Sequence, residues 1–145
     1  MRLQLALNVA DLEEAVTYYS RLFGTEPAKR KPGYANFAIA DPPLKLVLFE
    51  GAGAPGSINH LGVETESAAE VVAADARLRE SGLETTGIDD TICCFAEKTE
   101  TWVHGPDGLR WEWYVKSADV DQAHFESLTT GAACGAGPAS TCCPS

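Results

Sequence analysis

The chain has 145 residues, of which 45% are hydrophobic and 22% charged, and its formal net charge is −10. This length supports one soluble domain with a buried core, and the acidity argues against nucleic-acid binding, because phosphate contacts need Lys and Arg. The longest apolar runs are strand-sized, which argues against a membrane-spanning helix. The N-terminus lacks the basic flank and apolar region of a signal peptide, so we expect a cytoplasmic protein.

Apolar periodicity predicts a strand, a helix and two strands in the first half of the chain. Side chains alternate between apolar and polar over residues 3–9, which indicates a strand. Asp11 is typical of a helix N-cap, and apolar residues then recur at helical spacing until Gly24. The segment AKRKPG is predicted to be a basic turn, and strands are predicted at residues 34–40 and 44–50.

The second half repeats this order. Residues 59–64 are predicted to form a strand, and Ser67 with Glu70 forms a capping-box pattern at the start of a helix that Gly82 closes. Further strands are expected near residues 91–97, 100–104 and 109–115. Each half is therefore a strand, a helix and further strands.

The two halves predict a single domain over residues 1–117, with a first module at 1–54 and a second at 55–117. Residues 118–130 are expected to add a short helix or an extension. Residues 131–145 are small and lack periodicity, so they cannot bury enough apolar surface to offset the entropy cost of ordering. They are predicted to be a flexible, Cys-rich tail.

One polar side chain in each of three predicted strands is a candidate metal ligand. Alignment of the two halves places Gln4 opposite His60, and Val47 opposite Glu112. In each strand the polar residue alternates with apolar neighbours that would face the helices, so the three side chains are expected on an inner concave surface. An amide oxygen, an imidazole and a carboxylate suit a divalent metal. Val47 at the fourth position would leave coordination positions open.

Cys93 and Cys94 are adjacent thiols that could together chelate a soft, thiophilic centre. In a regular strand their side chains would point to opposite faces, so joint binding requires a loop or bulge. The preceding segment GIDDT lacks apolar alternation and permits a loop. The alternative is one buried and one exposed cysteine on an ordinary strand.

The chain holds five cysteines, an odd number that in a cytoplasmic protein favours metal binding or catalysis over a disulfide framework. Three of them cluster in the tail, where they either form an accessory thiol clamp or are incidental to an unstructured end: Cys134, Cys142 and Cys143. Trp102 and His104 are candidates for lining a pocket.

The sequence resembles one known family, the C–As bond lyases, some of which are called cadmium-induced proteins. The similar stretches are LQLALNVADLEEAVTYYSRLFGTEPAKRKPGYANFAIADPPLKLVLFEGAG, NHLGVE, the cysteine pair of DDTICC, and GPDGLRWEWY. This family belongs to the vicinal oxygen chelate superfamily, which also contains glyoxalase I and the extradiol dioxygenases. The resemblance covers about residues 2–117 and implies an α+β fold, in which two βαβββ modules form a cup-shaped mixed sheet.

The resemblance also implies a function. Fe(II) would be held by Gln4, His60 and Glu112, and the arsenic of the substrate by Cys93 and Cys94. The implied reaction is O2-dependent cleavage of the carbon–arsenic bond of trivalent organoarsenicals, with arsenite as a product and arsenic resistance as the outcome. Methylarsenite and reduced aromatic arsenicals are the implied substrates. Modules of this kind pair within or between chains, so the resemblance is also compatible with a homodimer.

Two other functions stay open. A glyoxalase-type isomerase with Ni or Zn would share the fold and the glutamine ligand, but it would not explain the thiol pair, and Val47 lacks the donor atom of a fourth ligand. A non-enzymatic protein that sequesters arsenic or cadmium through its cysteines would leave Gln4, His60 and Glu112 without a role.

Overall fold

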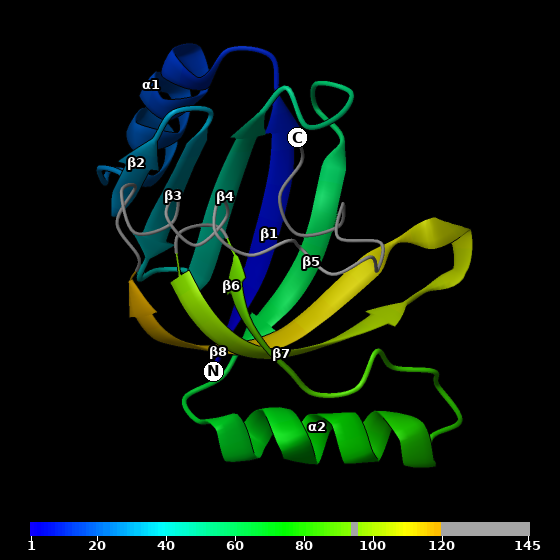
Figure 1. Cartoon of the computed structure of the whole chain (residues 1–145). Helices are drawn as coiled ribbons and strands as arrows, with labels where there is room; N and C mark the ends of the chain where they lie inside the picture. Colours follow the sequence, from blue (N-terminus) through cyan, green and yellow to red (C-terminus); the bar gives the residue numbers. More distant parts are fainter. Residues whose placement is uncertain (94–95, 120–145) are drawn as a thin grey trace, which may run out of the picture. The chain divides into compact units, whose positions relative to one another are not determined.

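The computed structural model describes residues 1–93 and 96–119, apart from the side chain of Cys93. The predictions for Cys94, for a helix or extension beyond residue 119 and for the three tail cysteines therefore lie outside the described residues. The described elements are β1 (Arg2–Val9), α1 (Leu12–Phe23), β2 (Lys29–Lys31), β3 (Tyr34–Ile39), β4 (Leu44–Glu50), β5 (Ile58–Glu64), α2 (Ala68–Glu80), β6 (Asp89–Cys93), β7 (Ala96–His104), a short 3-10 turn (Pro106–Gly108) and β8 (Arg110–Asp119) (Figure 1).

The element order repeats a strand, a helix and three strands twice, which confirms the predicted α+β class and its two βαβββ modules. The strands form a mixed sheet in the order β2-β3-β4-β1-β5-β8-β7-β6. The chain divides into two compact units, the first made of Met1–Glu64 and Val103–Glu112, the second of Thr65–Trp102 and the chain from Trp113 onwards. β5 belongs to the first unit because it pairs with β1.

In the first unit, α1 packs its apolar stripe against one face of the strands. The helix begins at Asp11, whose carboxylate accepts a hydrogen bond of 2.8 Å from the backbone of Glu14, and ends at Gly24 in the left-handed region. Each buried aliphatic side chain contributes about 1.5–3 kcal/mol. The core contains Leu12, Val16, Ala35, Phe37, Ile39, Leu46 and Leu48. The apolar packing on this face leaves the opposite face of β1 for polar side chains.

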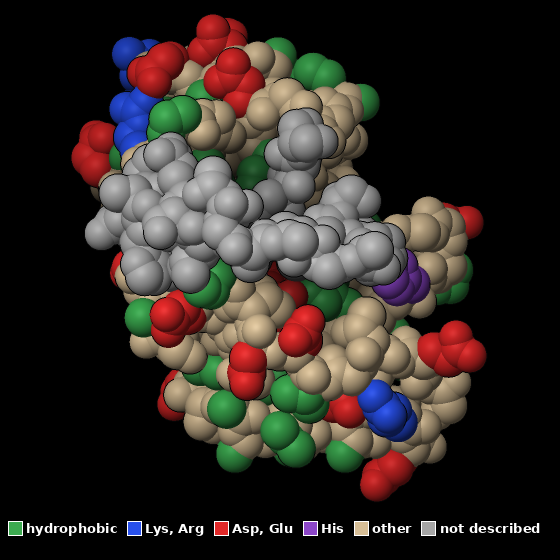
Figure 2. Space-filling model, viewed as in Figure 1, with side chains coloured by type: hydrophobic (Ala, Val, Ile, Leu, Met, Phe, Trp, Pro, Cys, Tyr) green, Lys and Arg blue, Asp and Glu red, His purple; other side chains and the backbone are tan. Residues whose placement is uncertain are grey.

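Two edge strands differ from the predictions. The expected basic turn AKRKPG contains β2, which pairs with β3 through a tight turn at Gly33, where φ is +70°. The expected loop GIDDT contributes Asp89–Thr91 to β6, which pairs with β7. Both strands are charged and lack apolar alternation, as is common at sheet edges. Periodicity therefore predicted no strand at β2 and placed the start of β6 two residues too late. Figure 2 shows Lys and Arg side chains gathered over β2.

In the second unit, α2 is fixed to β7 by a buried carboxylate. Asp75 accepts hydrogen bonds from Thr101 on β7 at 2.8 Å and from Thr85 at 2.6 Å. Burial raises the pKa of Asp75, but these two hydrogen bonds and the charge of Arg79 outweigh burial and hold it below its ordinary value. β8 runs to Asp119, so the chain continues as a strand at the start of the segment expected to be a helix or extension.

The capping box at the start of α2 gives a stability prediction. The Ser67 hydroxyl accepts from the backbone of Glu70, and the Glu70 carboxylate accepts from the backbone of Ser67. Ser67→Ala removes one of these bonds and should lower the free energy of unfolding by about 1 kcal/mol. Urea unfolding measures the change, and Ser117→Ala at an exposed position of β8 is the control. Equal midpoints for Ser67→Ala and the wild type would contradict the prediction.

Candidate functional site

The first unit brings Gln4, His60 and Glu112 together in its interior. The Gln4 amide Nε2 lies 3.1 Å from His60 Nε2 and 3.1 Å from the Glu112 Oε2 atom. His60 Nε2 lies 3.6 Å from the same oxygen. The exposed fractions of the three residues are 3%, 5% and 0%, respectively. The three side chains come from β1, β5 and β8. Strand alternation predicted that they share one face of the sheet, and the structure shows that they are in contact.

A glycine in β5 makes this contact possible. Gly62 pairs with Gln4 across the β1–β5 ladder. A Cβ atom at residue 62 would lie 3.2 Å from the Gln4 Nε2 atom and 3.3 Å from the backbone oxygen of Glu112. Gly62 thus leaves room for the Gln4 side chain. An isolated glycine inside a predicted strand is a signal of such a close approach, and the sequence reasoning did not use it.

The imidazole of His60 has a defined orientation. Its Nδ1 atom lies 2.8 Å from the Asn59 side-chain oxygen, and its ring lies 6.2 Å from the Phe49 ring, centroid to centroid. A neutral imidazole donates from one nitrogen and accepts at the other. Because Nδ1 faces an amide oxygen, it carries the proton, and the Nε2 lone pair faces Gln4 and Glu112. Asn59 is a contributor that the sequence reasoning missed.

The three side chains fit a divalent metal. An amide oxygen, a neutral imidazole nitrogen and a carboxylate oxygen are suitable donors for first-row metals. Ligand atoms at right angles around such a metal, about 2.1 Å from it, lie about 3 Å apart, close to the separations seen here. Rotation of the Gln4 amide by 180° exchanges its nitrogen and oxygen. Among the described residues no group of three His, Cys, Asp or Glu side chains could hold a metal ion. The candidate site here differs because one of its three donors is the Gln4 amide.

Val47 occupies the fourth position that the sequence comparison identified. It pairs with Ala6 on β1, and Ala6 pairs with His60 on β5, so the three residues form one row across the strands. Val47 is 3% exposed and offers no donor atom. The side chain of Glu50 instead accepts a hydrogen bond of 3.1 Å from the backbone of Leu12 at the start of α1.

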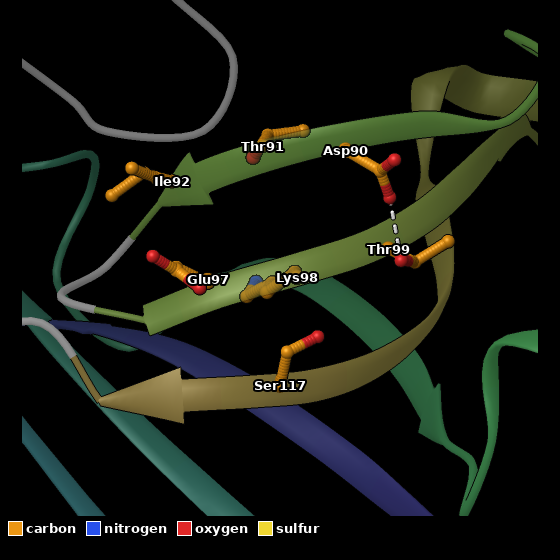
Figure 3. Close-up of a pocket in the computed structure, with 7 residues that line it drawn as sticks. All are labelled: Asp90, Thr91, Ile92, Glu97, Lys98, Thr99 and Ser117. Carbon is orange, nitrogen blue, oxygen red and sulfur yellow. Dashed lines mark hydrogen bonds between the residues drawn. The ribbon is translucent and has the colours of Figure 1, made fainter.

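The remaining candidates lie in or beside β6 and β7. Cys93 is the last described residue of β6 and pairs with Ala96. The Trp102 indole donates a hydrogen bond of 2.9 Å to Glu100, and His104 is exposed at the end of β7. A hollow of about 350 Å³ in the second unit is lined by none of the predicted site residues. Figure 3 shows its lining: Asp90, Thr91, Ile92, Glu97, Lys98, Thr99 and Ser117.

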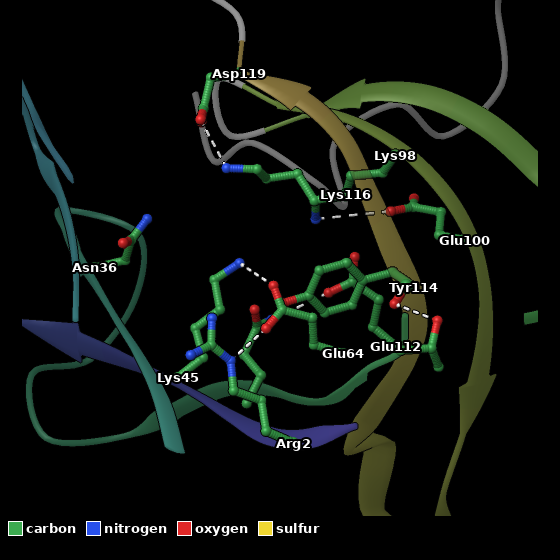
Figure 4. A network of polar contacts seen from close by, with 12 residues as sticks. Arg2, Asn36, Lys45, Glu64, Lys98, Glu100, Glu112, Tyr114, Lys116 and Asp119 are labelled. Atoms are coloured by element: carbon green, nitrogen blue, oxygen red, sulfur yellow. Dashed lines mark hydrogen bonds and ion pairs between the residues drawn. The ribbon is translucent and has the colours of Figure 1, made fainter. Parts of the chain in front are cut away.

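A second group of charges lies in the first unit. The carboxylate of Glu64 accepts from Arg2 and forms an ion pair with Lys45 at 3.4 Å (Figure 4). Burial raises the pKa of Glu64, but the charge of Lys45 and the hydrogen bond and charge of Arg2 outweigh it. The pKa of Glu64 therefore lies below its ordinary value of 4.5. Lys45 pairs with Gln4 in the β1–β4 ladder, so this group borders the candidate ligands.

Comparison with known proteins shows which superfamily the chain belongs to. The model of the Glyoxalase/Bleomycin resistance protein/Dioxygenase superfamily matches residues 3–113. The Mn(II)-bound glyoxalase from Novosphingobium aromaticivorans has the same fold, with a TM-score of 0.59 and 19% identity over 85% of this chain and 42% of that chain. The chain belongs to this superfamily and, within it, to the family of its cadmium-induced and organoarsenical-cleaving relatives.

Two of these relatives are 58% identical to the chain. The cadmium-induced protein CadI of Mycobacterium tuberculosis aligns over 142 residues, covering 98% of this chain and 92% of that protein. The trivalent organoarsenical cleaving enzyme of Thermomonospora curvata aligns over 121 residues, covering 83% and 80%. These relatives support an enzymatic role. Within the described residues, no helix is long and apolar enough to cross a membrane.

The Glu64 ion pairs predict a pH-dependent effect on stability. The pKa of Glu64 is lower in the folded protein than in the unfolded chain. The ionised Glu64 therefore contributes its full stabilisation of the fold above the unfolded-state pKa of 4.5, and this stabilisation is lost as the pH falls through the folded-state pKa. Glu64→Gln should therefore be less stable than the wild type at neutral pH, and this difference should shrink in more acidic solution. Urea unfolding at a series of pH values measures it, with Glu26→Gln at an exposed position as the control. A difference that stays constant with pH would contradict the assignment.

Proposed function

We propose that this protein is an Fe(II)- and O2-dependent enzyme that cleaves the carbon–arsenic bond of trivalent organoarsenicals and releases arsenite. The observation that carries the proposal is the contact of Gln4, His60 and Glu112, buried together on three strands. It occurs in a chain that is 58% identical to a trivalent organoarsenical cleaving enzyme. The donor set supports a metal centre, and the relative supports the substrate class.

In this proposal Gln4, His60 and Glu112 hold the metal. When bound, Fe(II) would supply the electrons that make O2 reactive toward a carbon–arsenic bond. The residues of the protein position and shield the metal: His60 presents its Nε2 atom, and Glu112 supplies a negative charge from which water is excluded. Val47 provides an apolar wall in place of a fourth donor, which leaves room for further ligands.

The thiols of Cys93 and Cys94 are proposed to bind the arsenic. A trivalent organoarsenical such as methylarsenite, CH3As(OH)2, carries two exchangeable oxygens and one carbon. Two thiols replace the two oxygens and release two water molecules, so the carbon is the one remaining substituent. Arsenite has three exchangeable oxygens and is held best by three thiols. A pair of thiols therefore favours the organic substrate and lets the product leave.

The proposed reaction balances with one O2 for each substrate. CH3As(OH)2 and O2 together contain the atoms of As(OH)3 and formaldehyde. The carbon is oxidised, arsenic remains trivalent, and O2 is reduced. Two thiols restrict the orientation of the bound substrate. Part of the entropy cost of reaching the reactive geometry is therefore met when the substrate binds, before the chemical step.

Iron, oxygen and arsenite can be followed in one experiment. The protein is loaded with Fe(II) without oxygen, methylarsenite is added with or without O2, and arsenite is quantified by separation and mass detection. Arsenite should form only when both iron and O2 are present. His60→Ala and Glu112→Ala should lose both Fe(II) and turnover, because each removes a donor of the proposed metal site.

Other outcomes of this experiment favour the alternative functions. Tight binding of methylarsenite without arsenite release would support sequestration. Arsenite release without O2 would contradict the O2-dependent reaction. An isomerase would leave the carbon–arsenic bond intact and would form no arsenite under either condition. Arsenite release by an iron-free His60→Ala protein at the wild-type rate would contradict the assignment of the metal ligands.

Substitution of the thiol pair tests substrate binding separately from metal binding. Cys93→Ser and Cys94→Ser should each abolish turnover of methylarsenite while Fe(II) binding persists, because serine does not exchange with arsenic-bound oxygen as thiolate does. The control replaces the tail thiols Cys134, Cys142 and Cys143 together with serine and should keep turnover. Normal turnover by Cys94→Ser would rule out the chelating pair.

A further inference from the structure

A change of register in β5 lies directly beside His60. Ala6 on β1 pairs with His60, but the next residue, Leu7, pairs with Ile58. Asn59 is therefore an extra residue between two paired positions, as in a β-bulge. In a regular strand the side chains of neighbouring residues point to opposite faces, whereas a bulge redirects one of them. The bulge explains how the Asn59 amide reaches the imidazole of the following residue.

The Asn59 amide belongs to a chain of hydrogen bonds that ends at a backbone carbonyl. Asn59 Nδ2 donates to the Asn8 side-chain oxygen at 3.0 Å, and Asn8 Nδ2 donates to the Ser57 hydroxyl at 2.9 Å. The Ser57 hydroxyl donates its proton to the backbone oxygen of Ala54. All of these residues lie in the first unit, and Asn8 is 5% exposed.

The Ala54 carbonyl fixes the direction of every bond in this chain because a carbonyl oxygen can only accept. The single hydroxyl proton of Ser57 is used toward Ala54, so Ser57 accepts from the Asn8 amino group. The Asn8 oxygen then accepts from the Asn59 amino group. This leaves the Asn59 oxygen for His60 Nδ1, which consequently carries the proton.

A glycine-rich loop holds Asn8 in place. The backbone of Asn8 donates to Ser57 at 2.9 Å and accepts from Gly56 at 2.8 Å. A Cβ atom at Gly53 would lie 2.7 Å from Asn8 Nδ2, which shows how closely the loop covers this amide. The loop therefore determines the position of the amide that holds Asn59.

We infer that Asn59 is a positioning residue. Through Nδ1 it holds His60 in the tautomer whose Nε2 atom can bind a metal, and the chain from Ala54 through Ser57 and Asn8 sets the direction of that bond. The opposite contact agrees, because the Gln4 amide donates toward Nε2. The inference rests on the proposed metal site. Outer hydrogen bonds of this kind fix the tautomer and orientation of metal-ligating histidines and typically change metal affinity by about 10–100-fold.

The tautomer can be measured in the metal-free protein. The chain has three histidines, so the ring ¹⁵N signals of His60 are assigned by comparison with His60→Gln. Long-range ¹H–¹⁵N correlation spectra should show the Nδ1–H tautomer in the wild type and a mixture in Asn59→Leu. Asn59→Asp retains the acceptor and should restore the Nδ1–H tautomer. A purely structural role of Asn59 would not produce this pattern.

Metal affinity is measured on the same variants with Fe(II) alone, without oxygen, in competition with a colorimetric chelator. Asn59→Leu should bind Fe(II) about 10–100-fold more weakly than the wild type, Ser57→Ala should show a smaller loss, and Asn59→Asp should recover most of the affinity. Asn36→Leu is the matched control, because the Asn36 amide donates to the Tyr34 hydroxyl at 2.8 Å. The control should leave the His60 tautomer and the Fe(II) affinity unchanged.

Two results would separate the possible failures. If His60→Ala loses Fe(II) but Asn59→Leu keeps both the wild-type tautomer and the wild-type affinity, the positioning role is wrong and the metal site stands. If His60→Ala binds Fe(II) as tightly as the wild type, the proposed metal site is wrong, and the role of Asn59 toward the metal is overturned with it.

Discussion

A carboxylate removed from water is costly unless hydrogen-bond donors or a cation compensate for the lost hydration. Glu112 is fully buried, and its Oε2 atom accepts a hydrogen bond of 3.1 Å from the Gln4 amide. β1 supplies this donor, and Gly62 in β5 leaves the space through which the Gln4 amide approaches.

β1 makes the arrangement possible because it pairs with a strand on each side, parallel to β4 and antiparallel to β5. Its apolar side chains pack toward α1, and its polar side chains point to the other face. A shift of pairing by one residue would exchange these faces, so the core against α1 also fixes the side on which Gln4 lies. The same packing that stabilises the helix thus determines the position of a candidate ligand.

The sequence predicted the contact of Gln4, His60 and Glu112 because strand alternation has a period of two and the two halves repeat. It did not predict β2, and it placed the start of β6 two residues too late, since the formation of an edge strand depends on backbone pairing with a neighbour rather than on apolar spacing. It also missed Asn59. The bulge that turns its amide toward His60 is a property of the β1–β5 register, and register depends on residues distant in the sequence. Gly62 was visible as an isolated glycine in a strand, but the side chain that it accommodates became clear only from the pairing.

The donor and acceptor roles at His60, Glu112 and Gln4 show which of the three side chains would have to turn in order to bind a metal. His60 already carries its proton on Nδ1, as the bond to Asn59 requires, so its Nε2 lone pair is available without a change of tautomer. The Glu112 oxygen already lies beside that nitrogen. The Gln4 amide, in contrast, presents its nitrogen to both groups and donates hydrogen bonds where a cation would attract them. A 180° rotation of this amide would turn its oxygen toward the same point. This rotation is the change that the proposed metal site requires of Gln4, whereas His60 keeps the orientation that its bond to Asn59 defines.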